Sequence, residues 1–106
     1  MEEFLKQLKK KDVFVLTSTG ESMMPVLQPK DVVYYNKVGF KKCRINDLVL
    51  VKKAGQFVTH RIIYRTRRYI VTKGDNNLRS DGKIFPRQLY AKVYRIKRGK
   101  KNMSKT

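Results

Sequence analysis

The sequence predicts an all-β fold: a small coiled β-sheet or partly open barrel, preceded by a short helix. Two observations lead to this prediction. The apolar residues fall in six short runs that are rich in β-branched and aromatic side chains, which favour strands. Stretches of turn-forming residues separate these runs at close spacing, a pattern typical of small barrels. With 106 residues, of which 41% are hydrophobic, the chain has the size and the core of one small domain.

The first element expected is a short amphipathic helix over residues 2–11. Phe4, Leu5 and Leu8 recur there at helical spacing. Acidic residues begin the segment and lysines end it, as the helix dipole favours. A helix this short must dock on the rest of the chain to be stable.

The β core is expected to follow over residues 13–96, so that residues 1–96 form a single domain. Its strands are predicted at residues 13–16, 31–35, 48–51, 57–64, 69–72 and 89–96. Residues 97–106 are basic and lack apolar periodicity, and they are predicted to form a flexible tail.

Two polar segments, residues 17–25 and 74–82, interrupt the strand pattern. The first contains small and hydroxylated residues, and the second holds two of the eight acidic residues of the chain. Loops that a rigid sheet supports are where function usually lies. These two loops are therefore the places to look for a site.

The charge of the chain is its most unusual property. Lys and Arg number 26 against 8 Asp and Glu, which gives a formal net charge of +18. Such a field attracts an anionic partner, which can be nucleic acid, an anionic membrane surface or an acidic peptide. The charge alone does not choose between them.

The single cysteine and the absence of long apolar runs exclude other classes. Cys43 cannot form an internal disulfide or build a zinc knuckle, and we expect it to be a free thiol, exposed or half-buried. Its reduced state fits a cytoplasmic protein. No apolar run approaches the ~20 residues of a membrane span, and the N-terminus lacks the apolar segment of a signal peptide. We therefore expect a soluble chain, at most peripheral to a membrane.

One set of residues could carry out nucleophilic catalysis. A catalytic serine needs a base to take its proton and a third group to orient that base. The one histidine, His60, lies in a predicted strand, and Ser22 lies in the first polar loop after the flexible Gly20. Asp75 and Asp81 of the second loop are the candidate orienting acids. The plainer alternative is a packed histidine beside a serine and aspartates that only form turns.

Five segments in a fixed order resemble the conserved boxes of signal peptidase I and its relatives. The likeness is greatest to the archaeal and endoplasmic-reticulum type, which uses Ser-His-Asp where the bacterial type uses Ser-Lys. It runs from about Val13 to Ile96. The segments are residues 20–25 (Gly-Glu-Ser-Met-Met-Pro), 27–33, 46–50, 59–63 (Thr-His-Arg-Ile-Ile) and 72–77 (Thr-Lys-Gly-Asp-Asn-Asn), followed by Asp81.

The resemblance implies a serine endopeptidase that removes a leader or signal segment and needs no cofactor or metal. Ser22 corresponds to the nucleophile and His60 to the general base. Asp81 is the first choice for the partner of His60, and Asp75 is expected to help shape the site. The resemblance also implies a coiled all-β core and a substrate bound as an extended strand.

The chain also departs from the family pattern. Lys30 and Asn46 stand where the family often has glycine before aspartate, so these turns are expected to be built differently. Gly20 stands where many signal peptidases have a serine that assists the oxyanion. The transmembrane helix that precedes the serine in membrane-bound members is replaced by the short segment 2–11. These departures leave the substrate open.

Two further hypotheses remain. A basic β-barrel could bind nucleic acid through clusters such as Arg65-Thr66-Arg67-Arg68, with tyrosines and phenylalanines that stack on bases. The chain could also be a catalytically inactive relative that serves as a scaffold. For a peptidase, the positive field could hold the chain near anionic lipid or attract an acidic leader.

Overall fold

The computed structural model of this protein describes residues 12–99 and 101–103, the last three by their backbone alone. The helix predicted over residues 2–11 lies outside the described residues. The strands are β1 (Val13–Thr17), β2 (Val32–Asn36), β3 (Leu48–Lys53), β4 (Gln56–Arg65), β5 (Ile70–Lys73), β6 (Gly82–Ile84), β7 (Leu89–Arg98) and β8 (Lys101–Met103). Two single-turn 3₁₀ helices, η1 (Phe40–Lys42) and η2 (Pro86–Gln88), complete the described structure. The all-β prediction is confirmed.

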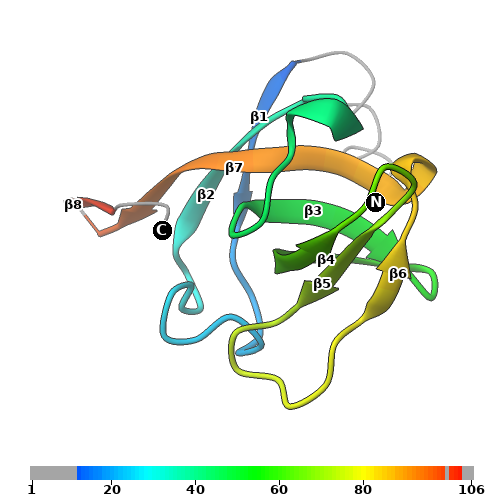
Figure 1. Cartoon of the computed structure of the whole chain (residues 1–106). Coiled ribbons are helices and arrows are strands. Elements are labelled where there is room, and N and C mark those ends of the chain that lie inside the picture. The colour runs from blue at the N-terminus through cyan, green and yellow to red at the C-terminus, as the bar shows by residue number, and fades with distance from the viewer. Residues whose placement is uncertain (1–11, 100, 104–106) are drawn as a thin grey trace.

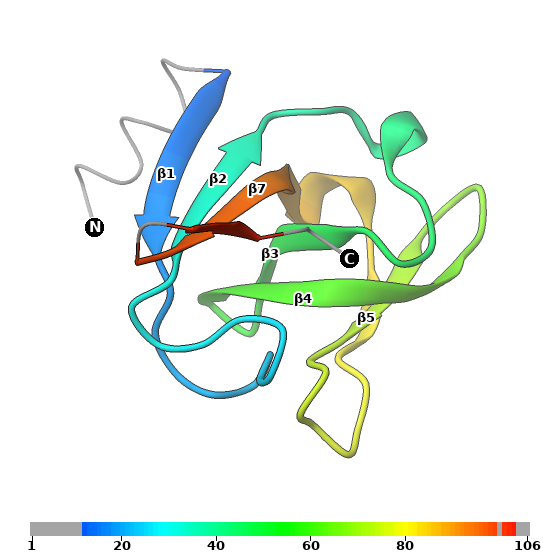
Figure 2. The same cartoon turned by 90° about the vertical axis from the view of Figure 1, so that its left-hand side faces the viewer.

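The strands form one open antiparallel sheet that does not close into a barrel (Figure 1). Their order is β1-β2-β7-β3-β4-β5-β6, and β8 pairs with β7 beside this path. Register shifts at Tyr34/Tyr35, Leu50/Val51 and Ile62/Tyr64 interrupt the ladders. Such irregularities increase the local twist, and the sheet coils until β1 and β4 cross at a steep angle (Figure 2).

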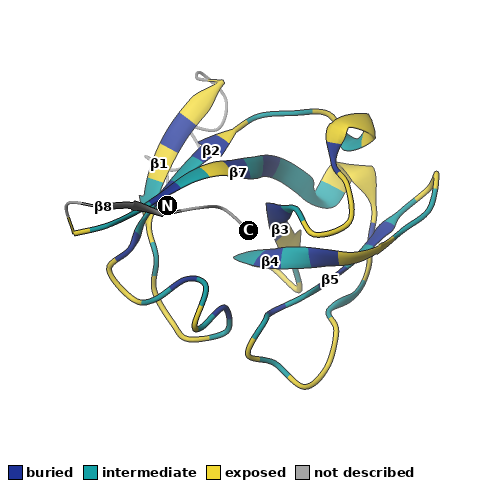
Figure 3. Cartoon of the chain, turned by 60° about the vertical axis from the view of Figure 1, so that its left-hand side comes forward, coloured by how far each residue is buried: buried dark blue, intermediate teal, exposed yellow. Residues whose placement is uncertain are grey.

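The coiled sheet encloses a core on each of its two faces. One core contains Phe14, Val33 and Leu50 among its buried residues, and the other contains Val51, Ile62 and Ile70. Strand β3 belongs to both, because its first four residues, Leu48, Val49, Leu50 and Val51, are all buried. Strand β1, by contrast, alternates exposed residues with one buried residue, Phe14, and one half-buried residue, Leu16 (Figure 3).

Three features differ from the sequence-based expectations. Strand β6 was not predicted. The prediction of a flexible tail that begins at residue 97 is wrong for its first residues. Strand β7 continues to Arg98, and β8 pairs with β7. Cys43, expected to be exposed or half-buried, is fully buried in the second core.

The turns at Lys30 and Asn46 have the backbone conformation that glycine favours. Their φ angles are 77° and 80°, in the left-handed region. Non-glycine residues therefore adopt this conformation here, and the expectation that these turns differ from those of the family stays a prediction.

The two polar loops emerge on the same side of the sheet, at the lower edge of Figure 1. Residues 18–31 connect β1 to β2, and residues 74–81 connect β5 to β6. The fold thus brings both loops to the strand that carries His60. Over the described residues, the protein contains no helix that is both long and apolar enough to cross a membrane.

Candidate active site

His60 lies in the middle of β4, where it faces Val49 of β3 across the ladder. Strand alternation places it on the same face as Ile62, and its exposed fraction is only 4%. Because β3 pairs along its whole length with residues 56–61 of β4, the backbone of His60 is firmly positioned. A buried imidazole needs partners for both ring nitrogens.

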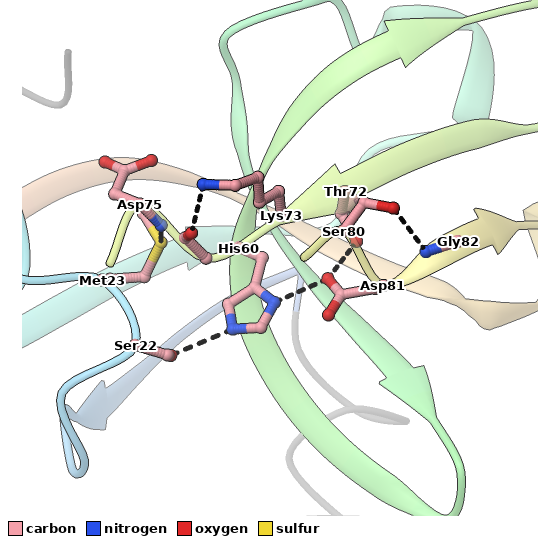
Figure 4. A network of polar contacts seen from close by, with 10 residues as sticks. Ser22, Met23, His60, Thr72, Lys73, Asp75, Ser80, Asp81 and Gly82 are labelled. Carbon is pink, nitrogen blue, oxygen red and sulfur yellow. Dashed lines mark hydrogen bonds and ion pairs between the residues drawn. The ribbon is translucent and has the colours of Figure 1, made fainter. Parts of the chain in front are cut away.

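Ser22 provides the partner on one side of the ring. Its Oγ lies 3.0 Å from Nε2 of His60 (Figure 4). The serine stands in the loop after β1, just beyond Gly20, whose φ of 75° lets the backbone turn sharply. The turn is closed by the hydrogen bond from the Met24 N–H to the Glu21 carbonyl. The loop therefore brings the hydroxyl to the histidine.

Asp81 provides the partner on the other side of the ring. Its Oδ2 lies 2.6 Å from Nδ1 of His60. The hydroxyl of Thr72 donates to the same oxygen at 2.6 Å, and the N–H of Asp81 donates to the Thr72 carbonyl at 2.7 Å. Burial raises the pKa of the Asp81 carboxyl, but the hydrogen bonds from His60 and Thr72 outweigh it, so the pKa is lowered below its ordinary value. The carboxylate is therefore ionised at neutral pH.

Asp75, the other candidate acid, is engaged elsewhere. Its two carboxylate oxygens accept hydrogen bonds of 2.9 and 2.8 Å from Nε and Nη2 of Arg61. Figure 4 shows this carboxylate turned away from the imidazole. The alternative in which Asp75 orients His60 is therefore wrong. The reason is strand alternation, which points Arg61 and His60 to opposite faces of β4.

The two loops are joined at the serine. The N–H of Asn76 donates to the Ser22 carbonyl at 2.8 Å, and its Nδ2 donates to the Glu21 carbonyl at 3.0 Å. The Asp75 N–H lies 3.2 Å from the sulfur of Met23. These contacts fix the serine relative to the loop that also carries Asp81.

A pocket of about 250 Å³ opens beside Ser22. Its lining includes residues 16–20, Ser22 itself and the apolar side chains of Leu27, Val33 and Leu50. Tyr35 and Thr59 also line it, and their hydroxyl oxygens are 2.6 Å apart. Burial raises the pKa of Tyr35 to about 12, so its phenol stays protonated and neutral. The pocket can therefore hold an uncharged side chain next to the serine hydroxyl.

Two residues that the sequence did not single out support the site. Thr72 holds the carboxylate of Asp81, and Arg61 holds that of Asp75. Both lie within segments already noted for other residues. The sequence did contain a pattern that indicates Arg61. It follows His60 in the same strand, and the loop of residues 74–82 contains two aspartates, one for each of these side chains.

Comparisons with protein-family models, with curated proteins and with solved structures find no match for this chain. Within residues 12–99, no three His, Cys, Asp or Glu side chains are grouped so that they could hold a metal ion.

The geometry of the site is a hydroxyl, an imidazole and a carboxylate in series. With its proton on Nδ1 facing Asp81, the imidazole presents Nε2 as an acceptor to Ser22. A hydroxyl whose proton can pass to such a base can attack an electrophilic carbon. The adjacent pocket offers space for a substrate group.

Proposed function

We propose that this protein is a serine endopeptidase, similar in mechanism to signal peptidase I, which removes a leader or signal segment from a peptide or protein. The observation that carries the proposal is the continuous contact from Ser22 Oγ through His60 to Asp81, at 3.0 and 2.6 Å. The five ordered segments that resemble the family support it.

In the proposed mechanism, Ser22 Oγ attacks the scissile carbonyl carbon and its proton passes to Nε2 of His60. The imidazolium then gives this proton to the leaving amine nitrogen as the C–N bond breaks, which leaves an acyl ester on Ser22. Water repeats the sequence: His60 takes its proton, the oxygen attacks the ester, and the proton returns to Ser22. Asp81 holds the ring and stabilises its positive form.

The substrate is proposed to bind in an extended conformation beside the first loop. In the described part of the sheet, β1 is an edge strand that pairs with β2. An extended peptide can add to such an edge through main-chain hydrogen bonds and direct alternate side chains toward the pocket. The backbone N–H of Ser22 is the proposed donor to the oxyanion.

The net charge of +18 suggests where the enzyme works and what it attracts. We propose a cytoplasmic location with peripheral contact to anionic membrane, since each well-placed Lys or Arg contributes about 1 kcal/mol to such contact. An acidic leader would be attracted by the same field.

The test is cleavage of a peptide library by the purified protein, read by mass spectrometry, together with labelling by a serine-directed fluorophosphonate probe. Ser22→Ala and His60→Ala are each expected to abolish cleavage and labelling. Ser80→Ala is the matched control, because this exposed serine lies beside Asp81 and its Oγ accepts a hydrogen bond from the Gly82 N–H.

Circular dichroism of each variant checks that the sheet is retained. Cleavage that persists in a folded Ser22→Ala protein would refute the proposal. A folded wild-type protein that neither labels nor cleaves would support the inactive scaffold instead.

A further inference from the structure

Three aromatic side chains lie together at neighbouring strand ends, away from the candidate active site. We call Tyr64, Tyr69 and Phe85 the aromatic strip. The ring centroids of Tyr64 and Tyr69 are 6.4 Å apart, and those of Tyr69 and Phe85 are 5.9 Å apart. Tyr64 and Phe85 are 53% and 40% exposed.

Strand pairing explains why these rings meet. Ile70 pairs with Ile84, so Tyr69 and Phe85, which lie just outside this pair, are brought together. Tyr64 pairs with Val71, which lies two residues from Tyr69 and so points to the same side as that ring. The register shift between Ile62 and Tyr64 then turns Tyr64 away from the buried face that carries His60 and Ile62. The strip therefore forms a surface distinct from the triad.

Cations surround the aromatic strip. Nζ of Lys83 lies 4.8 Å from the centroid of the Tyr69 ring. Arg67 and Arg68 are exposed in the turn that leads into Tyr69. The sequence contains no Asp or Glu from residue 48 to 74 or from residue 82 to its end. The segments that build this surface thus bring positive charge without acidic residues of their own.

Four of the eight acidic residues are held in ion pairs away from the strip. These pairs join Asp31 with Arg98, Asp47 with Lys92, Asp75 with Arg61 and Asp81 with His60. Within the described part of the chain, none of these ion pairs involves Lys83, Arg67 or Arg68, so these cations can bind a partner that carries its own negative charge.

We propose that the aromatic strip and its cations bind single-stranded nucleic acid. Bases stack on exposed aromatic faces, and Lys and Arg beside them bind the phosphates. The two exposed rings, Tyr64 and Phe85, can each take a separate base. Unpaired bases are required, because a duplex hides the faces on which the rings would stack.

An anionic membrane is the competing partner, and the arrangement of the strip disfavours it. Two of the three rings are tyrosines, and a lysine is stacked directly on the central ring. Stacked cations leave the ring surface charged instead of apolar, whereas insertion among lipid chains requires an apolar surface. This surface fits a ligand that alternates flat rings with charges.

The test is fluorescence anisotropy with labelled oligo(dT) and oligo(U), measured over a range of salt concentrations. Wild type is expected to bind with an affinity that falls as salt rises. Tyr64→Leu and Phe85→Leu, which keep apolar bulk, should each weaken binding by about tenfold. The double variant Arg67→Gln/Arg68→Gln should lower the slope of log affinity against log salt by about 1.

The control removes the same charge from other exposed positions, in the variant Lys52→Gln/Arg79→Gln. It should lower affinity much less than the arginine pair of the strip. Equal losses in both double variants would show general attraction by net charge and would overturn the proposal. So would the absence of binding, binding of duplex as tight as of single strand, or binding confined to phosphatidylserine vesicles.

Discussion

Gly74 lies directly against the backbone of the candidate nucleophile. A Cβ at residue 74 would stand 2.6 Å from the carbonyl oxygen of Ser22 and 2.6 Å from Nδ2 of Asn77. Real Cβ atoms do not come so close to a carbonyl. Glycine at this position therefore allows the loop after β5 to reach the serine turn.

We predict that Gly74→Ala separates the two loops. The added methyl group cannot be placed without moving the Ser22 backbone, and overpacking of this kind costs about 1–3 kcal/mol of the free energy of unfolding. Urea denaturation measures this loss, and labelling by the serine probe should slow with it. Gly39→Ala is the control, because nothing lies within 4 Å of a Cβ there and its φ is −72°.

Removal of the Thr72 hydroxyl should weaken the orienting acid. Thr72→Val keeps the shape of the side chain but deletes the 2.6 Å hydrogen bond to Asp81. The pKa of Asp81 should then rise, because one of the bonds that stabilise its ionised form is lost. A carboxyl-carbon NMR titration reads this pKa directly. An unchanged pKa in a folded variant would contradict the role given to Thr72.

Arg98 should contribute stability that depends on pH. The hydrogen bonds from Arg98 lower the pKa of the buried Asp31 carboxyl. Because the folded-state pKa lies below the unfolded value of about 3.9, this contribution is complete above that pH. It is lost as pH falls through the folded-state pKa.

Arg98→Gln is therefore expected to destabilise the protein at neutral pH, and the difference from wild type should shrink in acid. Thermal unfolding at a series of pH values measures both effects. Arg87→Gln, at an exposed position in η2, is the control and should match wild type throughout. A gap that stayed constant down to low pH would contradict the assignment.

Lys30→Gly should stabilise the protein. Lys30 has a φ of 77°, a left-handed conformation that costs a side chain with a Cβ about 1 kcal/mol. Glycine removes this cost, and the greater freedom of the unfolded chain offsets part of the gain. Chemical denaturation should show a small increase in the free energy of unfolding. Asn46→Gly should gain less, because asparagine tolerates this conformation better.

Cys43 should be inert in the folded protein. It is fully buried, and desolvation raises the pKa of its thiol, which keeps the thiol protonated. A thiol reagent such as dithionitrobenzoate should therefore react slowly with the native protein and quickly in denaturant. Fast reaction of native protein would mean that the second core opens readily.

The long strands could be predicted from the sequence because each buries enough β-branched residues to show its pattern. Strand β6 could not, because its three residues contain one buried side chain, Ile84, and pair with β5 only after the chain has folded back. The end of β7 was missed for a similar reason. Its last residue is an arginine, and what holds it there is Asp31, 67 residues earlier in the chain.

The residues of the candidate site could be predicted from the sequence, but the separate roles of its two aspartates could not. Ser22 and His60 followed from the need for a nucleophile and a base in a chain with one histidine. The roles of Asp75 and Asp81 required the three-dimensional loop. Alternation along β4 sends His60 and Arg61 to opposite faces, and each of them takes one of the two carboxylates.

The candidate triad is divided between two kinds of structure. His60 is hydrogen-bonded into β4 opposite β3, the strand that is buried on both faces, whereas Ser22 lies in the loop between β1 and β2. Backbone amides of β3 should therefore exchange with deuterium only through global unfolding, while those of residues 18–24 exchange through local opening. Such openings would separate the Ser22 hydroxyl from His60 while the sheet stays folded. The rate of any reaction that needs both groups together would then be proportional to the fraction of molecules in which the serine loop is closed.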